Sequence, residues 1–263
     1  MCLSQDTPFG KECQMQAVTY RGLKFYQFQA LARLGLRHAV FTRQGGHSSG
    51  PYQGLNLSFE VGDAPENVQR NRCLIKETLG VSVLLSAKQI HGKRAFILKK
   101  PLSEDLEVSG YDILITDQPG VGVLVKQADC QAIVLFDPSR RVLALVHAGW
   151  RGLVAGVVEE ALCLLRKEFN SRPEDLWAAI SPSLGPCCAE FRDYQKIFPP
   201  EFWPFRVQGN YFDLPAITRD KLLQGGLQKE KIFISGICTK CQPEFFSYRR
   251  EKRTGRFGTL AAL

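Results

Sequence analysis

The sequence predicts an α+β fold (mixed α/β), a single domain over residues 1–263 in which mixed β-sheets are flanked by helices. Three observations lead to this prediction. Residues 142–146 (VLALV) form an unbroken apolar run, which is typical of a strand buried on both faces. Apolar residues then recur at helical spacing over residues 153–162. No repeat, low-complexity linker or shift in composition divides the 263 residues.

The strands are predicted from short apolar or alternating runs that end at turn residues. The first 15 residues show no such pattern, and we expect them to be poorly ordered. The segment 42–58 contains Pro51 and several glycines, so we expect an ordered loop there. The expected strands cover residues 18–26, 38–41, 87–91, 94–98, 113–116, 122–126, 133–136, 142–147, 176–180 and 231–237.

Three helices are expected. In the first, Asp63 can cap the N-terminus, Pro65 suits the first turn, Glu66 lies three residues after the cap, and Gly80 can end the helix. Its buried side would be formed by Val68, Leu74, Ile75 and Leu79. The other two helices are expected over residues 152–169 and 214–223.

Composition excludes several classes of protein. The net charge is +8, but the Lys and Arg residues are scattered and form no nucleic-acid-binding signature, so we expect a phosphate-bearing small substrate and no nucleic acid. No apolar run approaches the roughly 20 residues of a membrane helix, and the start of the chain does not resemble a signal peptide. Nine cysteines, an odd number, fit reduced thiols. We therefore expect a cytoplasmic protein with no membrane contact.

Three side chains are candidate metal ligands. His91 and His147 each follow an apolar run, and Cys130 lies between two such runs, so all three are expected at strand ends or in adjacent turns. Two imidazoles and one thiolate suit zinc, and three protein ligands leave a fourth position open, as in catalytic sites. Such a metal would activate a bound water or polarise a substrate oxygen. Asp129 could orient a ligand or transfer a proton.

The spacing alone leaves other interpretations open. The three residues could be a buried structural cysteine and two hydrogen-bonded histidines. Alternatively, Cys130 and His147 could be the nucleophile and base of a cysteine hydrolase, with Asp129 or another polar group orienting the base. The chain could also bind metal without being an enzyme. Zinc content separates the first two interpretations from a metal site.

Six motifs, in this order along the chain, resemble the signatures of the YfiH family, which is also called the multicopper polyphenol oxidase or laccase-domain family. The resemblance covers about residues 38–258. The matching motifs are FTRQGGHSSGPYQGLNLSFEVGDAPENVQRNR (41–72), KQIHG (88–92), ADCQAIVLFDP (128–138), VHAGWRG (146–152), SPSLGPCC (181–188) and FFSYRREKRTGRFG (245–258).

The resemblance implies a zinc-dependent purine nucleoside enzyme. Such an enzyme would phosphorolyse adenosine, inosine, guanosine and methylthioadenosine, with inorganic phosphate as co-substrate, and would deaminate adenosine. The family's metal ligands fall on His91, Cys130 and His147, which would hold one zinc per chain in a monomer or homodimer. Within the same family, an amidase that edits peptidoglycan precursors remains the alternative.

The chain has too few candidate copper ligands for a laccase. Multicopper oxidases use about ten histidine ligands, whereas this chain has four histidines and two methionines. The sequence therefore supports one metal site of the zinc type and excludes a multicopper site.

Phosphorolysis requires a site for an anion, and the planar guanidinium of arginine suits phosphate oxygens. Arg43 is the first candidate for a catalytic and phosphate-binding role, because neighbouring glycines leave backbone N–H groups and space. Arg151, Arg249 and Arg250 are further candidates. His47 could touch the substrate, but its position departs from the family pattern and better fits a solvent-facing loop residue.

Two cysteine motifs remain. Cys238 and Cys241 form a C-x-x-C motif. The other closely spaced pair of cysteines is Cys187 with Cys188. A C-x-x-C motif can be a redox pair or part of a zinc site, but only one is present, so we interpret Cys238 and Cys241 as structural thiols. The resemblance places Cys187, Cys188 and Cys238 in recurrent family motifs and implies no catalytic role for them. Trp150 is interpreted as a packing residue behind the His147 turn.

Overall fold

The computed structural model describes residues 15–263, so the expectation for the first 15 residues falls, apart from Met15, outside the described part of the chain. The helices are α1 (Gln29–Arg33), α2 (Pro65–Leu79), α3 (Trp150–Ala155), α4 (Val157–Phe169), α5 (Tyr194–Ile197), α6 (Leu214–Gln224) and α7 (Tyr248–Glu251). The strands are β1 (Met15–Tyr20), β2 (Leu23–Phe28), β3 (Arg37–Phe41), β4 (Val83–Lys88), β5 (Ala95–Leu98), β6 (Leu106–Ser109), β7 (Ile113–Thr116), β8 (Val121–Gln127), β9 (Gln131–Asp137), β10 (Val142–Ala148), β11 (Trp177–Ile180), β12 (Arg206–Gln208), β13 (Tyr211–Phe212), β14 (Ile232–Ile234) and β15 (Phe257–Ala262).

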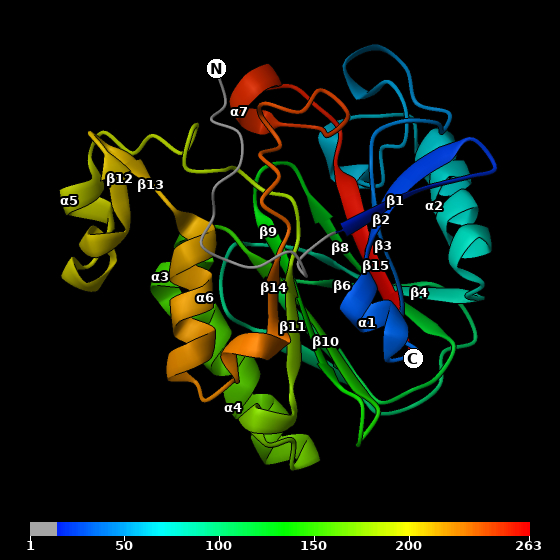
Figure 1. Cartoon of the computed structure of the whole chain (residues 1–263). Helices are drawn as coiled ribbons and strands as arrows, with labels where there is room; N and C mark the ends of the chain where they lie inside the picture. Colours follow the sequence, from blue (N-terminus) through cyan, green and yellow to red (C-terminus); the bar gives the residue numbers. More distant parts are fainter. Residues whose placement is uncertain (1–14) are drawn as a thin grey trace.

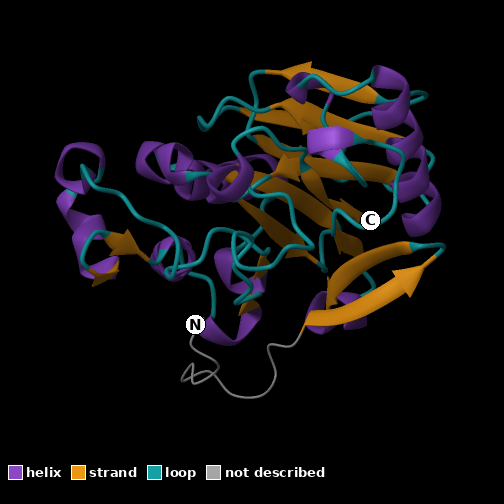
Figure 2. Cartoon of the chain, turned by 90° about the horizontal axis from the view of Figure 1, so that it is seen from above, coloured by secondary structure: helices purple, strands orange, loops and turns teal. Residues whose placement is uncertain are grey.

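Two mixed sheets form the centre of the molecule (Figure 1). The seven-stranded sheet has the order β1-β2-β3-β15-β8-β4-β6, and the six-stranded sheet has the order β14-β11-β9-β10-β7-β5. β12 and β13 form a separate small hairpin. In Figure 2, α5 with this hairpin projects from one side of the molecule, and the β1–β2 hairpin projects from another. The predicted class, mixed sheets flanked by helices, is confirmed.

Three apolar clusters divide the molecule into four layers. One cluster lies between the sheets and contains Val125 of β8 and Leu145 of β10. The second joins the outer face of the six-stranded sheet to α4 and α6. The third joins the outer face of the seven-stranded sheet to α2, where Ile75 is fully buried. The layers therefore run helix, sheet, sheet, helix.

The position of β10 explains its continuous apolar sequence. Leu143 and Leu145 point into the cluster between the sheets, whereas Ala144 and Val146 pack toward α4 on the other face. Because both faces are covered by protein, neither set of alternating positions can be polar. β10 ends at Ala148, so His147 lies near the end of this buried strand, at the rim of the core.

Several predicted strands need correction. The segment 18–26 is two strands, because Arg21 and Gly22 have positive φ and form a turn between β1 and β2. The strand predicted at 87–91 is β4, which ends at Lys88, because His91 has a φ of 63° and Ile90 is exposed. β6, β12, β13 and β15 were not predicted. β15 is central in the seven-stranded sheet, but its small residues gave no strand signal.

The helices need similar corrections. The helix predicted over 152–169 is broken at Gly156, whose φ of 83° ends α3 and begins α4. α2 begins at Pro65 and ends at Gly80, as predicted, but its N-cap is Ala64 and Asp63 makes no cap bond. Its buried face also differs from the prediction, since Asn71 and Arg72 are buried and Leu74 is only partly buried.

Asn71 is buried because it holds the predicted loop after β3. Its side-chain amide donates to the backbone oxygens of Gly54 and Asn56, and its Oδ1 accepts the N–H of His47. Within the loop, Ser48 and Gly54 form one isolated antiparallel bridge, and the bonds of Asn71 satisfy further backbone groups. Within residues 15–263, no helix has both the length and the apolar character to cross a bilayer.

Candidate metal centre

His91, Cys130 and His147 lie together where the two sheets meet. His91 follows β4 of the seven-stranded sheet, His147 belongs to β10 of the six-stranded sheet, and Cys130 lies in the turn from β8 to β9 that connects the sheets. Their ligand atoms all lie within 4.8 Å of one another. His147 is buried, Cys130 is half-buried and His91 is exposed. The cluster therefore opens to solvent on the His91 side.

Asp112 holds both histidines in position. Its Oδ1 accepts a hydrogen bond from His147 Nδ1 at 2.8 Å and from the backbone N–H of His91 at 2.9 Å. Its Oδ2 accepts the backbone N–H groups of Gly92 at 2.8 Å and Ile90 at 3.3 Å. Because Nδ1 of His147 is used in this way, its Nε2 is left for a ligand. Sequence analysis missed Asp112; the only signal was an acidic residue directly before an apolar strand.

Gln89 anchors the turn that carries His91. Its side-chain Nε2 donates to the carbonyl of Lys126, and its Oε1 accepts the N–H of the same residue. Gln89 thus replaces one rung of the β4–β8 ladder just beyond the last residue of β4. The chain can then turn sharply, and His91 takes a positive φ of 63°. The Gln89 side chain thus anchors the Q-I-H-G turn to β8, and Asp112 accepts the backbone N–H groups of the turn.

The charges of the cluster favour a thiolate. Burial acts to raise the pKa of Cys130, but His147 and His91 outweigh it and lower the pKa to about 6. Burial acts to lower the pKa of His147, but the Cys130 thiolate and Asp112 raise it to about 9. Without a metal, Cys130 and His147 therefore form a thiolate–imidazolium pair. A thiolate is the form of cysteine that binds metals and attacks electrophiles.

Gly149 covers the cluster from the start of α3. A Cβ atom at Gly149 would lie 2.8 Å from Cys130 Sγ and 3.1 Å from His91 Cδ2. A side chain at this position would displace two of the three candidate ligands. The glycine of the H-A-G-W-R-G motif therefore serves a close approach, while Trp150 packs edge-on against Phe191 and Phe198, as predicted for a packing residue.

The carboxylate of Asp129 points away from the histidines. Its Oδ1 accepts the hydroxyl of Thr239 at 2.7 Å, and its Oδ2 accepts the backbone N–H of Arg249 at 2.6 Å. Asp129 has a positive φ of 94°, a conformation that tertiary bonds must stabilise. The position next to Cys130 suggested a residue that orients the ligands, but the structure gives this contact to Asp112.

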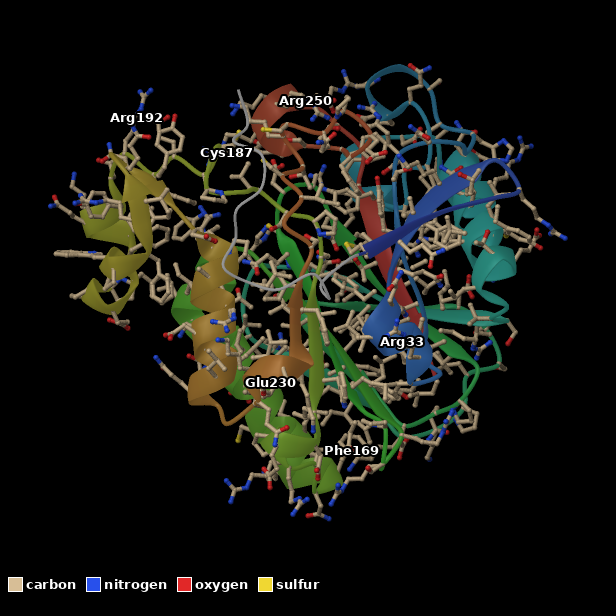
Figure 3. All side chains as sticks on the ribbon, in the orientation of Figure 1. Arg33, Phe169, Cys187, Arg192, Glu230 and Arg250 are labelled. Carbon is tan, nitrogen blue, oxygen red and sulfur yellow. The ribbon has the colours of Figure 1, made fainter. Side chains whose placement is uncertain are left out.

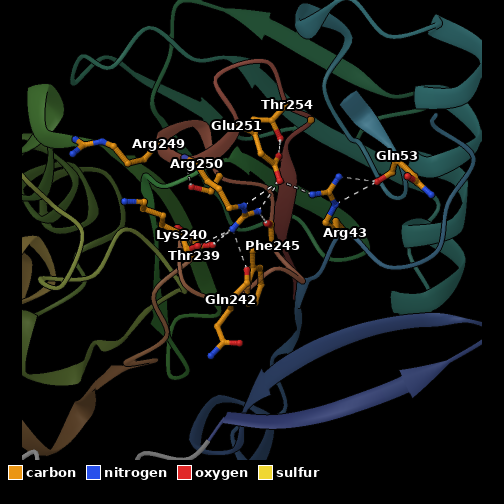
Figure 4. Close-up of polar contacts among 12 residues, drawn as sticks. Arg43, Gln53, Thr239, Lys240, Gln242, Phe245, Arg249, Arg250, Glu251 and Thr254 are labelled. Carbon is orange, nitrogen blue, oxygen red and sulfur yellow. Dashed lines mark hydrogen bonds and ion pairs between the residues drawn. The ribbon is translucent and has the colours of Figure 1, made fainter. Parts of the chain in front are cut away.

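Arg43 and Arg250 meet on one carboxylate. Glu251 Oε1 lies 2.8 Å from Arg43 Nη1 and 2.8 Å from Arg250 Nη2, and Figure 4 shows the two guanidinium groups approaching Glu251 from opposite sides. Arg250 also donates to the carbonyls of Thr239 and Lys240 at 2.9 Å. The donors of Arg250 are thus committed to protein oxygens. Arg43 keeps longer contacts of 3.4 Å to the Gln53 carbonyl, besides its ion pair.

The other predicted anion-binding residues differ in environment. Arg249 Nη1 donates to the carbonyls of Cys188 and Glu190 at 3.2 and 3.0 Å. Arg151 is exposed, and its guanidinium carbon lies 4.5 Å from the ring centroid of Trp150. His47 is exposed in the loop after β3, as its sequence context suggested.

Arg256 is a basic residue that sequence analysis missed. It is half-buried, and its Nη1 donates to the carbonyls of Thr254 and Gly255 at 2.9 and 3.0 Å. Burial lowers the pKa of Arg256, against the attraction of Cys130 and Asp129. Arg256 thus lies within electrostatic reach of the candidate metal ligand Cys130. Its motif, R-T-G-R-F-G, was recognised, but no feature of the sequence distinguishes Arg256 from Arg249 or Arg250.

The chain is similar to known proteins over most of its length. Residues 37–263 match the family model described as multi-copper polyphenol oxidoreductase laccase. The chain is 34% identical over 233 residues to the purine nucleoside phosphorylase YlmD of Geobacillus stearothermophilus, covering 81% of this chain and 84% of that protein. It is 33% identical over 241 residues to the purine nucleoside phosphorylase YfiH of Escherichia coli (strain K12), covering 87% of this chain and 94% of that protein.

Solved structures show the same fold. The crystal structure of YlmD from Geobacillus stearothermophilus superposes with a TM-score of 0.84 at 31% identity, covering 94% of this chain and 98% of that one. The structure of the hypothetical protein YfiH from Bacillus licheniformis gives a TM-score of 0.81 at 25% identity, covering 91% and 96%. From the family model and these relatives together, the chain belongs to the laccase-like family of YfiH and YlmD.

Proposed function

We propose that this protein is a zinc-dependent purine nucleoside phosphorylase that also deaminates adenosine. One observation carries the proposal: two imidazoles and a thiolate, from three distant parts of the chain, place their ligand atoms within 4.8 Å of one another. Relatives named purine nucleoside phosphorylases, which match more than four fifths of the chain, supply the substrate class.

The donor set fits zinc in its chemistry. Zinc accepts nitrogen and thiolate sulfur ligands, and three protein ligands are typical of a catalytic site. Cys130, with a pKa of about 6, provides the thiolate at neutral pH. Asp112 bonds to His147 Nδ1, the type of carboxylate contact that supports histidine ligands. Bound there, zinc would supply a Lewis acid able to polarise a substrate group.

The protein's own residues would orient the metal ligands and bind the two substrates. Asp112 keeps Nε2 of His147 directed into the cluster, and Gln89 fixes the turn of His91. The exposed edge at His91 admits the nucleoside. Phosphate would bind to Arg256 and Arg43, because Arg250 already bonds to four protein carbonyls and a carboxylate.

A second candidate function is cysteine hydrolase chemistry. The arrangement Cys130, His147 and Asp112 has the order of a nucleophile, a base and a residue that orients the base. His91 has no role in such a triad, although Asp112 and Gln89 fix the turn that carries it. The fixed position of this second imidazole therefore favours the metal site.

The test uses the full chain, purified without added chelator. Adenosine, inosine, guanosine and methylthioadenosine are each incubated with and without phosphate, and free base, inosine and ammonia are measured. We expect free base to be released when phosphate is present. We expect ammonia to be formed from adenosine and from none of the other three nucleosides. Cys130→Ser should lose both activities, and Cys163→Ser, at an exposed cysteine of α4, should keep them.

Two results would overturn the proposal. A zinc-loaded protein that forms neither base nor ammonia would exclude the nucleoside activity, and release of serine from a UDP-linked muramoyl-serine would then support the amidase alternative. A protein that retains activity after complete removal of metal, and loses it on alkylation of Cys130, would support the cysteine hydrolase.

A further inference from the structure

Four cysteines form a second cluster on the same side of the molecule. Cys187 and Cys188 lie in the loop after β11, and Cys238 and Cys241 lie in the loop after β14. β11 and β14 are parallel neighbours, with Ala178 opposite Ile232, so both loops leave the same end of the sheet. An isolated parallel bridge between Ser183 and Cys238 continues this pairing into the loops. The two cysteine pairs, 50 residues apart, are thus brought together by the sheet.

The sulfur atoms are spaced as in a tetrathiolate metal site. Cys241 Sγ lies 3.6 Å from Cys187 Sγ and 3.5 Å from Cys188 Sγ, and all four sulfurs lie within 4.8 Å of one another. Zinc with four sulfur ligands at about 2.3 Å requires sulfur atoms about 3.8 Å apart at the edges of a tetrahedron. A disulfide bond would bring two sulfurs to about 2.05 Å. The spacing is that of four ligands around one ion.

A backbone N–H group stabilises thiolate charge on Cys238. The N–H of Gly185 donates to Cys238 Sγ at 3.3 Å. A Cβ atom on Gly185 would lie 3.0 Å from Cys238 Cβ and 3.6 Å from Cys187 Sγ, so the glycine permits the close approach of the two loops. Cys238 is buried, Cys188 and Cys241 are half-buried, and Cys187 is exposed. An ion could thus enter from the Cys187 side, and its other ligands would be shielded from solvent.

Two arginines hold the loops that carry the cysteines. Arg249 donates to the carbonyl of Cys188 in the first loop. Arg250 donates to the carbonyls of Thr239 and Lys240 in the second loop. Figure 3 shows Cys187 and Arg250 at the same end of the molecule, and Figure 4 shows the bonds of Arg250 to the second loop. Their positive charges also offset the net negative charge of four thiolates around a divalent ion.

We propose that Cys187, Cys188, Cys238 and Cys241 bind a second zinc ion, which has a structural role. Four protein sulfurs complete a tetrahedral shell and leave no open position for substrate. The proposal gives the structural thiols Cys238 and Cys241 a ligand and adds Cys187 and Cys188 to the same site.

Asp129 links the second site to the first. Thr239 lies between Cys238 and Cys241, and its hydroxyl donates to Asp129, the residue before Cys130. The carbonyl of Asp129 also accepts the N–H of Leu184, in the first cysteine loop. An ion that ties the two loops together would therefore hold two of the three hydrogen-bond partners of Asp129, Thr239 and Leu184, and keep the Cys130 turn in place.

The test counts zinc in the full chain, purified under reducing conditions and without added metal. We expect about two zinc ions per chain in the wild type and about one in each of Cys130→Ser and the double variant C238S/C241S. Cys163→Ser, at an exposed cysteine outside both clusters, should keep both ions. X-ray absorption at the zinc edge of Cys130→Ser should show four sulfur neighbours at about 2.3 Å.

The second proposal can fail independently of the proposed function. If Cys130→Ser contains no zinc, or if its zinc has nitrogen or oxygen neighbours, the tetrathiolate site is excluded and the first site is unaffected. A disulfide between the loops in reduced wild type, found by mass spectrometry, would exclude it as well. If C238S/C241S does not fold, Cys187→Ser serves instead, because Cys187 is exposed; the variant should release the second zinc to a chelator at least tenfold faster than the wild type.

Discussion

His147 Nδ1 donates to Asp112 Oδ1 at 2.8 Å, and the backbone N–H of His91 donates to the same oxygen at 2.9 Å. One carboxylate oxygen thus sets the ring of one candidate ligand and the main chain of another. The backbone N–H of His147 also donates to the carbonyl of Asp112, at 2.7 Å. Burial acts to raise the pKa of Asp112, but the bonds from His147, Gly92 and His91 lower it, so this residue is a carboxylate at neutral pH.

Replacement of Asp112 by asparagine should weaken zinc binding by about 10- to 100-fold, the usual effect of losing a carboxylate behind a histidine ligand. The amide removes the negative charge and one acceptor for the turn of His91. Zinc affinity can be measured by competition with a chromophoric chelator. Asp117→Asn, at an exposed aspartate just after β7, is the matched control. Equal affinities for the two variants would contradict the role of Asp112.

Gly149→Ala should abolish high-affinity binding at the first site while the protein remains folded. The φ of Gly149 is −83°, which alanine adopts freely, but the added Cβ would lie 2.8 Å from Cys130 Sγ. Gly120→Ala is the reverse case, because Gly120 has a φ of 77° and no atom within 4 Å of an added Cβ. That variant should lose about 1 kcal/mol of stability and keep its zinc. Zinc content and thermal unfolding of both variants test the contrast, and normal zinc content in Gly149→Ala would refute it.

Removal of the metal should expose Cys130 to alkylation. In the zinc-loaded protein the thiolate is shared with the metal and should react slowly with iodoacetamide. After chelation, its pKa of about 6 leaves it largely ionised at pH 7.5, so it should be modified much faster. Peptide mapping identifies the modified cysteine, and exposed Cys163 reports the unchanged background rate. A Cys130 rate that does not respond to chelator would argue against zinc at this site.

The site was predictable from sequence only in part, and the reason is the range of the interactions. Each of His91, Cys130 and His147 follows an apolar run and lies at a strand end or in the turn beside it, so local patterns identify it as a residue at the rim of the core. The partners that position these residues are distant in sequence: Asp112 lies 35 residues from His147, and Gln89 lies 37 residues from Lys126. Local patterns carry no information on such pairs.

The same limit explains the arginines and the missed strands. The ion pair of Arg43 with Glu251 spans 208 residues, so the sequence could not show that this guanidinium is partly neutralised. β15 pairs with both β3 and β8. Its small residues Ala261 and Ala262 are buried because neighbouring strands enclose β15 on both sides. By contrast, β10 was predicted correctly, because burial on both faces leaves an apolar run that local analysis detects.

Arg256→Gln should raise the KM for phosphate about tenfold, equivalent to about 1.4 kcal/mol, because it removes a charge-assisted contact to the anion. The kcat at saturating phosphate should change less than KM. Arg256→Lys should restore part of the affinity, and Arg166→Gln, at an exposed position of α4, should not alter it. Steady-state kinetics with varied phosphate test this. An unchanged KM in Arg256→Gln would assign the phosphate to Arg43 instead.

Glu107 should stabilise the fold in a pH-dependent way. Its carboxylate lies between Arg72, at 3.2 Å, and the buried Lys126, whose Nζ also contacts it. Burial acts to raise the pKa of Glu107, but the two cations outweigh it and lower the pKa below its ordinary value. A group whose pKa is lower in the folded than in the unfolded state stabilises the fold above its unfolded pKa, and this contribution is lost as the pH falls through the folded pKa.

Glu107→Gln should therefore lower the free energy of unfolding by about 2 kcal/mol at pH 7, less than the roughly 3–5 kcal/mol of a fully buried pair, because Glu107 keeps some solvent contact. The difference from the wild type should remain constant down to about pH 5 and shrink below the unfolded pKa of about 4.3. Urea unfolding between pH 7 and pH 3.5 measures it. Glu104→Gln, at an exposed residue three positions earlier, should change stability little at any pH. A Glu107→Gln deficit that persists undiminished at the lowest pH would mean that the lost stability comes from packing and that the ion pairs contribute little.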